Sequence, residues 1–178
     1  MLIICFAIMA VLVAVDQIIK YFIVANFEIS AYNKYFTFGI GDFDIISIMH
    51  IRNDGAAWSF LSGQTWLLLA ITAVVMIAII LYMFVSRGKM PKLESVSLSL
   101  IVAGGIGNLI DRVRMLIEPD FTGVIDYINF EFISFPVFNF ADICVVIGGC
   151  LFLLNYIVTE IKDYKAKKLS KEVQNGTY

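Results

Sequence analysis

Four stretches of predominantly apolar residues constrain the fold of this chain more than any other feature of its sequence. They cover residues 3–24, 66–85, 96–116 and 141–161, and each is close to the roughly 20 residues that a helix needs to cross a bilayer core. Of the 178 residues, 60% are hydrophobic, which exceeds the share in typical soluble domains. The sequence therefore predicts an all-α membrane protein, a single domain with four transmembrane helices.

Lysine and arginine predict how these helices are oriented. The connection after the second helix holds three basic residues, and the tail 162–178 holds five lysines. Because cytoplasmic loops carry an excess of basic residues, both segments and both termini are expected in the cytoplasm. The segments of about 25–65 and 117–140 then lie outside. The first contains FDIISIMHIRNDG, whose β-branched run before Asn-Asp-Gly predicts a strand and a turn, and hence a small extracytoplasmic β element.

Two groups of polar side chains occur within the predicted helices, where an ionised group costs about 2.5–3.5 kcal/mol at the helix centre. Asp16 and Lys20 are four residues apart in the first helix, so they share one face and form either a structural ion pair or part of a site. Asn108, Asp111 and Arg112 share a face near the outward end of the third helix. The glycines of the preceding GGIG allow another helix to approach closely.

Three acids are expected at the outer membrane surface. Asp111 lies near the end of the third helix, Asp142 begins the fourth, and Asp126 lies between them in the apolar VIDYI. A structural role explains Asp142 as a helix-start acid and Asp111 as the partner of a neighbouring arginine, but Asp126 has no comparable explanation. Two adjacent carboxyl groups share one proton and can then activate a water molecule, as in aspartic proteases.

This chemistry requires neither a metal ion nor a cofactor, and the sequence predicts neither. The three cysteines lie in apolar stretches without the close spacing of a metal or redox site, so they are expected to act as small hydrophobic side chains. The net charge of −2, with no basic stripe outside the tail, argues against a nucleic-acid partner.

Five sequence blocks stand out along the chain. They are DQIIK from Asp16, RNDGAAWSFLSG from Arg52, GGIGNLIDR from Gly104, VIDYI from Val124 and FPVFNFAD from Phe135. In this order, and with four predicted helices between them, they resemble the type II signal peptidases of bacteria, the prolipoprotein signal peptidases. The resemblance covers nearly the whole chain up to about Tyr156.

This resemblance implies an intramembrane aspartyl protease of the bacterial cytoplasmic membrane, with four helices, a small extracytoplasmic β cradle and a membrane-surface segment. Such an enzyme removes the signal peptide of a prolipoprotein just before a cysteine that carries diacylglycerol. Its catalytic acids here would be Asp126 and Asp142. Its partners would be the diacylglyceryl-modified prolipoprotein, membrane lipid and an inhibitor of the globomycin type.

The resemblance also assigns residues that bind the substrate or support the two acids. They are Asn53, Gly55, Asn108, Asp111, Arg112, Asn139, Asp16 and Lys20. One departure from the family is the connection Val113–Ile125, which is longer than usual and leaves the orientation of Glu118 and Asp120 open.

Two other classes of function remain compatible with the acids. A small proton- or cation-coupled membrane carrier would use them as a translocation relay, but carriers place such groups near the membrane midplane and show inverted repeats, and the sequence shows neither. A non-catalytic scaffold would not depend on them at all.

Overall fold

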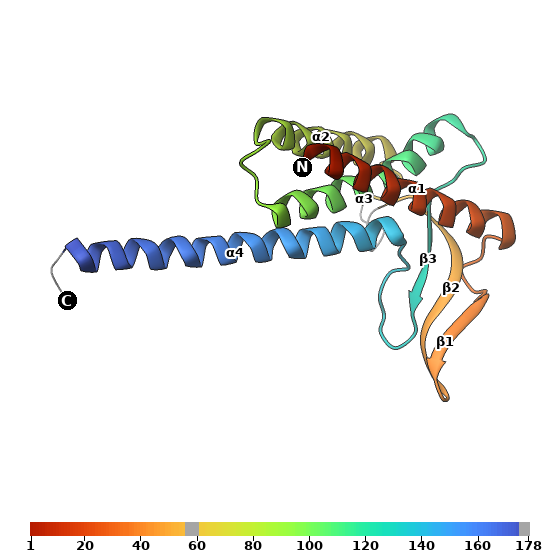
Figure 1. Ribbon diagram of the computed structural model, residues 1–178. Coiled ribbons are helices and arrows are strands. Elements are labelled where there is room, and N and C mark those ends of the chain that lie inside the picture. Colours follow the sequence, from red (N-terminus) through yellow and green to blue (C-terminus); the bar gives the residue numbers. More distant parts are fainter. Residues whose placement is uncertain (56–60, 175–178) are drawn as a thin grey trace.

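The computed structural model describes residues 1–55 and 61–174, so part of the second sequence block, Ala56–Phe60, lies outside the described residues. These described residues form four helices and three strands (Figure 1). In chain order they are α1 (Leu2–Asn26), β1 (Phe36–Ile40), β2 (Phe43–Asn53), α2 (Thr65–Val85), α3 (Lys92–Ile117), β3 (Val124–Phe130) and α4 (Phe140–Gln174).

All four helices are long and apolar enough to cross a membrane, which confirms the predicted multi-pass membrane fold. All four are longer than the apolar stretches that predict them, and α3 and α4 differ most. Helix α3 already begins at Lys92, directly after Pro91, and α4 continues through the lysine-rich segment to Gln174. Hydropathy marks where a helix contacts lipid, whereas the hydrogen-bonded helix continues through polar residues that favour a helix.

Helix α3 is the centre of the bundle and packs against α1, α2 and α4. Its contact with α1 and α2 is an apolar core that includes Met9, Met76 and Val102. Its contact with α4 depends on glycine. A Cβ atom at Gly104 would collide with the carbonyl oxygen of Ala141 and lie 2.8 Å from a methyl group of Val145. The two backbones therefore approach as closely as the predicted role of these glycines requires.

Gly104→Ala is expected to push α3 and α4 apart and to lower the free energy of unfolding by about 1–3 kcal/mol, the usual cost of overpacking. Thermal unfolding in detergent measures this loss. Gly149→Ala is the matched control, because a Cβ atom there would meet nothing within 4 Å. Equal stability of the two variants would contradict this account of the α3–α4 contact.

The three strands form one antiparallel sheet in the order β1-β2-β3. The hairpin β1–β2 confirms the β element predicted between the first two helices, whereas β3 comes from the connection before α4, where no strand was predicted. Ile51 pairs with Asp126, and Asn53 with Val124. A bridge between Ile128 and Phe138 then brings the chain to the start of α4. The sheet thus fixes Asp126 beside the first turn of α4.

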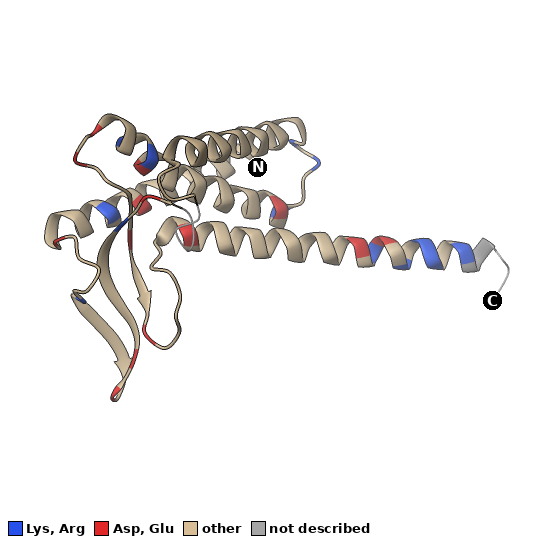
Figure 2. Cartoon of the chain, turned by 180° about the vertical axis from the view of Figure 1, so that it is seen from behind, with Lys and Arg blue, Asp and Glu red and all other residues tan. Residues whose placement is uncertain are grey.

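The sheet and the lysine-rich end of α4 lie at opposite ends of the molecule. In Figure 1 the sheet projects from one end of the bundle, while α4 extends far beyond the bundle at the other end. The N-terminus and the α2–α3 connection lie toward this second end. Figure 2 shows that the charged residues of α4, apart from one acid at its start, are confined to this extension.

Candidate active site

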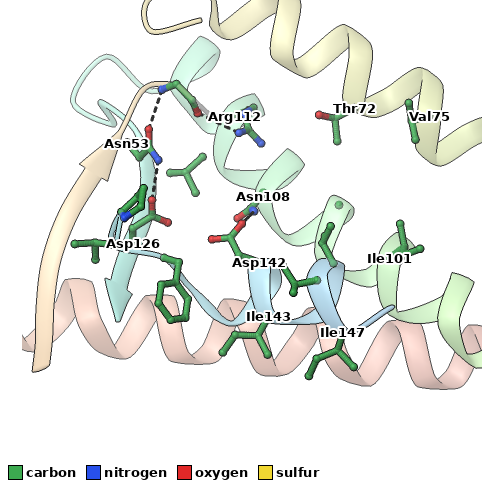
Figure 3. A pocket seen from close by; sticks show the side chains of 18 of the residues that line it. Asn53, Thr72, Val75, Ile101, Asn108, Arg112, Asp126, Asp142, Ile143 and Ile147 are labelled. Atoms are coloured by element: carbon green, nitrogen blue, oxygen red, sulfur yellow. Dashed lines mark hydrogen bonds between the residues drawn. The ribbon is translucent and has the colours of Figure 1, made fainter. Parts of the chain in front are cut away.

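Asp126 and Asp142 face each other from two different elements, the strand β3 and the first turn of α4 (Figure 3). The Asp126 side chain accepts hydrogen bonds at both oxygens, from Asn53 Nδ2 at 2.9 Å and from Asn139 Nδ2 at 2.6 Å. Asp142 accepts from Asn108 Nδ2 at 2.7 Å and from the backbone N–H of Asn139 at 3.0 Å. Each carboxyl group is thus oriented by two donors.

Asn139 connects the two acids. Its Oδ1 accepts from the backbone N–H of Asp142 at 3.0 Å, while its own N–H donates to the Asp142 carboxylate. This reciprocal pair is a capping box that starts α4. The remaining amide group, Nδ2, donates to Asp126. Among the described residues no hydrogen bond joins Asp126 directly to Asp142, so the fully buried Asn139 is their common partner.

Asn108 links Asp142 to a buried charge cluster behind the site. Its Oδ1 accepts from Lys20 Nζ and from Asn139 Nδ2, both at 3.0 Å. With the oxygen occupied by two donors, the Nδ2 group of Asn108 must face Asp142. Lys20 therefore fixes the orientation of an amide that holds Asp142.

Lys20 forms ion pairs with two acids, Asp16 at 3.0 Å and Asp111 at 2.9 Å, and all three side chains are almost fully buried. The predicted pair of Asp16 and Lys20 is present. The suggested pair of Asp111 with an arginine is not, because Lys20 takes that place. Asp16 also accepts from the backbone N–H of Ala141, and Asp111 from that of Ile125. The cluster thus ties α1 and α3 to the segments that carry both acids of the site.

Asn53, Gly55 and Arg112 form the other side of the site. Asn53 Oδ1 accepts from the backbone N–H of Gly55 at 3.0 Å, so the Asn53 amide is oriented with its Nδ2 toward Asp126. Arg112 donates to the carbonyl oxygen of Gly55 at 3.3 Å. Arg112 forms no salt bridge within residues 1–55 and 61–174, and its side chain lines the same cavity as the two acids.

A cavity of about 670 Å³ opens in front of the two acids. Its polar groups gather at one end, around Asp126 and Asp142, and the rest of its wall is apolar (Figure 3). Thr72 and Val75 of α2 lie across the cavity from Ile143 and Ile147 of α4. The volume is within the range of about 300–1,000 Å³ that is common for ligand sites, and the combination of an apolar wall with few convergent polar groups is typical of them.

The ten residues singled out from the sequence are all brought together, in two layers. Six line the cavity, and four lie behind them. The lining residues are Asn53, Gly55, Asn108, Arg112, Asp126 and Asp142; the others are Asn139, Asp16, Lys20 and Asp111, which are buried.

Burial and, to a smaller extent, the nearby charge of Asp142 raise the pKa of Asp126 to about 7. The hydrogen bonds from Asn53 and Asn139 oppose this shift without cancelling it. Asp126 lies on β3, outside the spanning helices. Near neutral pH Asp126 is therefore partly protonated, and a proton held by one of two neighbouring carboxyl groups is what general acid–base chemistry with such a pair requires.

Two features of the site were not found from the sequence. Tyr127 accepts a hydrogen bond at its hydroxyl from the backbone N–H of Phe140 at 3.1 Å, and so helps to fix the start of α4. In the sequence, only the position of Tyr127 directly after Asp126 indicated that it could belong to the site. The long connection after α3 is anchored by Phe121, whose ring is buried beneath the guanidinium groups of Arg52 and Arg114. Glu118 of this connection pairs with Arg114.

The fold and this arrangement of side chains define a multi-pass membrane enzyme with its polar site at one end of an apolar cavity. The profile of the family described as Signal peptidase (SPase) II matches residues 8–158. The chain belongs to this signal peptidase II family, and is accordingly a protease.

Relatives and solved structures agree with this assignment. The chain is similar to the lipoprotein signal peptidase of Enterococcus faecalis, with 36% identity over 99% of this chain and 98% of that protein. It is also similar to the lipoprotein signal peptidase of Lactococcus lactis subsp. cremoris, with 38% identity over 75% of this chain and 79% of that protein. A solved bacterial membrane enzyme superimposes with a TM-score of 0.72 at 32% identity, over 92% of this chain and 90% of that chain.

Proposed function

We propose that this chain removes signal peptides from diacylglyceryl-modified bacterial prolipoproteins by aspartyl endopeptidase chemistry, and cuts just before the lipid-modified cysteine. The observation that carries the proposal is the pair of Asp126 and Asp142, which are oriented by Asn139 at the polar end of an apolar cavity. The names of the similar proteins, which are lipoprotein signal peptidases, support the choice of substrate.

In the proposed reaction Asp142 is the general base and Asp126 the general acid. Asp142 takes a proton from a water molecule whose oxygen attacks the scissile carbonyl carbon, while Asp126 gives its proton to the carbonyl oxygen. The result is a neutral tetrahedral diol. The carbon–nitrogen bond then breaks as Asp142 passes its proton to the leaving amine and Asp126 recovers a proton from a hydroxyl group. This sequence restores both acids to their starting state.

The surrounding residues suit these two roles. Asn108 and Asn139 donate hydrogen bonds to the two oxygens of Asp142 and so hold this side chain in place beside Asp126. The buried position of Asp126, which raises its pKa to about 7, favours the protonated form. Arg112 and Asn53 line the cavity beside the acids and offer N–H donors to peptide carbonyl groups that lipid cannot satisfy.

The apolar wall of the cavity is proposed to hold the signal peptide and the acyl chains of the substrate. An inhibitor of the globomycin type would occupy the same cavity. The proposed orientation places both termini in the cytoplasm and the site at the outer face of the bacterial cytoplasmic membrane. The basic residues of the α2–α3 connection and of the α4 extension, at the end opposite the sheet, support this orientation (Figure 2).

Cleavage by the purified protein in detergent micelles tests the proposal. The substrate is a diacylglyceryl-modified prolipoprotein, and the control is the same precursor without the lipid. We expect cleavage of the modified precursor alone, with the lipid-modified cysteine at the new N-terminus. Failure to cut it, or cleavage at another bond, would overturn the proposed function. Proton flux through proteoliposomes without any cleavage would instead favour a carrier.

The proposed proton on Asp126 predicts how activity depends on pH. Because the pKa of Asp126 is raised to about 7, the general acid loses its proton as the pH rises through this value. We expect kcat/KM to fall tenfold per pH unit on the alkaline side, above about pH 7. A rate that stays constant from about pH 6 to about pH 9 would contradict the assignment of the proton.

Asp126 also makes the free energy of unfolding depend on pH, in a direction that its pKa predicts. The pKa of Asp126 is higher in the folded protein than its ordinary value of 3.8, so folding favours the protonated form. Its contribution to stability is therefore complete below about pH 4 and decreases as the pH rises toward about 7. In Asp126→Asn this part of the pH dependence of unfolding should be absent, which provides an activity-independent control.

A further inference from the structure

A second cavity lies at the end of the bundle opposite the two acids. It measures about 400 Å³ and is enclosed by the start of α1, the end of α2 and the α2–α3 connection with the start of α3. The lining residues are Met1, Leu2, Cys5, Met83, Arg87, Gly88, Met90, Lys92 and Ser95. Neither the proposed reaction nor the family assignment gives this cavity a role.

The inner part of the cavity is apolar and belongs to the core of the bundle. Cys5 and Met83 are each 1% exposed and pack in the cluster that joins α1, α2 and α3. Leu2 and Met90 pack against the same cluster from outside. The cavity therefore leads from the molecular surface to apolar side chains between the spanning helices.

The mouth of the cavity is cationic. Arg87 and Lys92 line it and are both exposed, and no Asp or Glu is among the lining residues. The acid in the first turn of α3, Glu94, accepts a hydrogen bond from the hydroxyl of Tyr82 at 2.7 Å and is not part of the lining. Lys92 is also the first residue of α3, where the helix dipole adds positive potential.

An apolar interior beneath two cationic side chains matches one chemical class, an amphiphile with an anionic head. The cavity opens at the ends of spanning helices, which is the level at which lipid headgroups lie. A soluble anion would use the charges and leave the partly buried Leu2 and Met90 in contact with water, whereas an acyl chain covers them. Arginine and lysine are the common protein ligands of phosphate groups.

We propose that this cavity binds an acidic phospholipid, with the phosphate between Arg87 and Lys92 and part of an acyl chain against Leu2 and Met90. The site is separate from the proposed active site. Its occupation would brace the ends of α1, α2 and α3 against one another.

Native mass spectrometry of the purified protein in a neutral detergent, titrated with phosphatidylglycerol or phosphatidylcholine, tests the proposal. We expect phosphatidylglycerol to bind with a stoichiometry near one and to bind at least about tenfold more tightly than phosphatidylcholine, as expected for a charge-assisted contact. Arg87→Gln and Lys92→Gln should each weaken phosphatidylglycerol binding by about tenfold. Lys89→Gln removes a charge from the same connection outside the cavity lining and should retain the wild-type affinity.

Three results would overturn the proposal. Equal weakening by Lys89→Gln would show general attraction to the basic connection rather than a site. Equal affinity for the two lipids would exclude recognition of the anionic head. Glycerol 3-phosphate, which carries the head without acyl chains, should not compete at concentrations that match the lipid; effective competition would exclude a role for the apolar interior. Cleavage activity of the Arg87 and Lys92 variants should stay at the wild-type level in detergent and confirms that they fold.

Discussion

Replacing Asp142 or Asp126 with asparagine should lower kcat/KM for a diacylglyceryl-modified prolipoprotein by at least about 1,000-fold, because each change removes a group that transfers a proton in the reaction. Asparagine has nearly the same shape as aspartate, so the capping box at Asn139 and the packing around the site should persist. An asparagine at position 142 can donate or accept hydrogen bonds but cannot take a proton from water. An asparagine at position 126 has no acidic proton to deliver.

Asp120→Asn is the matched control for both variants. It makes the same chemical change at an exposed acid of the connection between α3 and β3, and should leave cleavage unchanged. Thermal unfolding of all three variants separates a loss of chemistry from a loss of fold. If either Asp126→Asn or Asp142→Asn retained more than about a tenth of the wild-type activity, the assignment of the two roles would be wrong.

The second large effect is expected at Lys20, which neutralises two buried acids. Lys20→Met removes the cation and leaves Asp16 and Asp111 with uncompensated charges in a buried position. Removal of one partner from such a cluster typically costs about 3–5 kcal/mol. The variant should therefore unfold at a much lower temperature than the wild type. It should also lose activity, because the Asn108 amide that holds Asp142 loses a donor.

A variant in which Asp16 and Asp111 are both replaced by neutral residues separates the contribution of the Lys20 charge from the contribution of its packing. In Asp16→Asn/Asp111→Asn the further change Lys20→Met should cost far less than in the wild type, because methionine fills a similar volume and no unpaired carboxylate remains. Comparison of the four unfolding free energies gives the coupling between Lys20 and the acids. An equal cost of Lys20→Met in both backgrounds would show that the lysine contributes through packing alone.

The helices could be predicted from the sequence because their signal is local. A spanning segment is recognised from about 20 consecutive residues, and all four were found. Their ends were less accurate, since α4 extends to Gln174 through residues that favour a helix without being apolar. Strand β3 was missed, although VIDYINF contains residues that favour strands, because its partner β2 is distant in sequence and the pairing register is not encoded locally.

The residues proposed from the sequence lie together in the structure, but the hydrogen bonds and ion pairs among them could not be predicted. Topology and family resemblance together selected Asp126 and Asp142 as a pair. The shared partner Asn139 was named, yet its simultaneous contacts with both acids depend on the bridge that returns the chain to α4. Lys20 was expected to pair with Asp16, its neighbour on the same helix. Its contacts with Asp111 and Asn108 cross from α1 to α3, and helix packing alone decides them.

The connection between α3 and β3 also shows that contacts between residues distant in sequence could not be predicted. Its unusual length was visible, but not its anchor. The ring of Phe121 contacts two arginines, one from β2 and one from α3. Glu118 forms an ion pair with Arg114, four residues earlier in the chain. Only the second of these contacts, four residues apart along the chain, follows a local spacing rule. The connection is thus held in place and delivers β3 to the sheet.

An infrared titration of the protonated carboxyl groups, carried out on the wild type, Asp126→Asn and Asp142→Asn, tests the central claim most directly. The claim is that Asp126 and Asp142 act as one pair that retains a proton near neutral pH. We predict a carboxyl C=O band that disappears with a midpoint at about pH 7, is absent from Asp126→Asn, and shifts to lower pH in Asp142→Asn, where the neighbouring charge is removed. A wild-type spectrum without any carboxyl band that titrates near this pH, or with one that persists in Asp126→Asn, would contradict the claim.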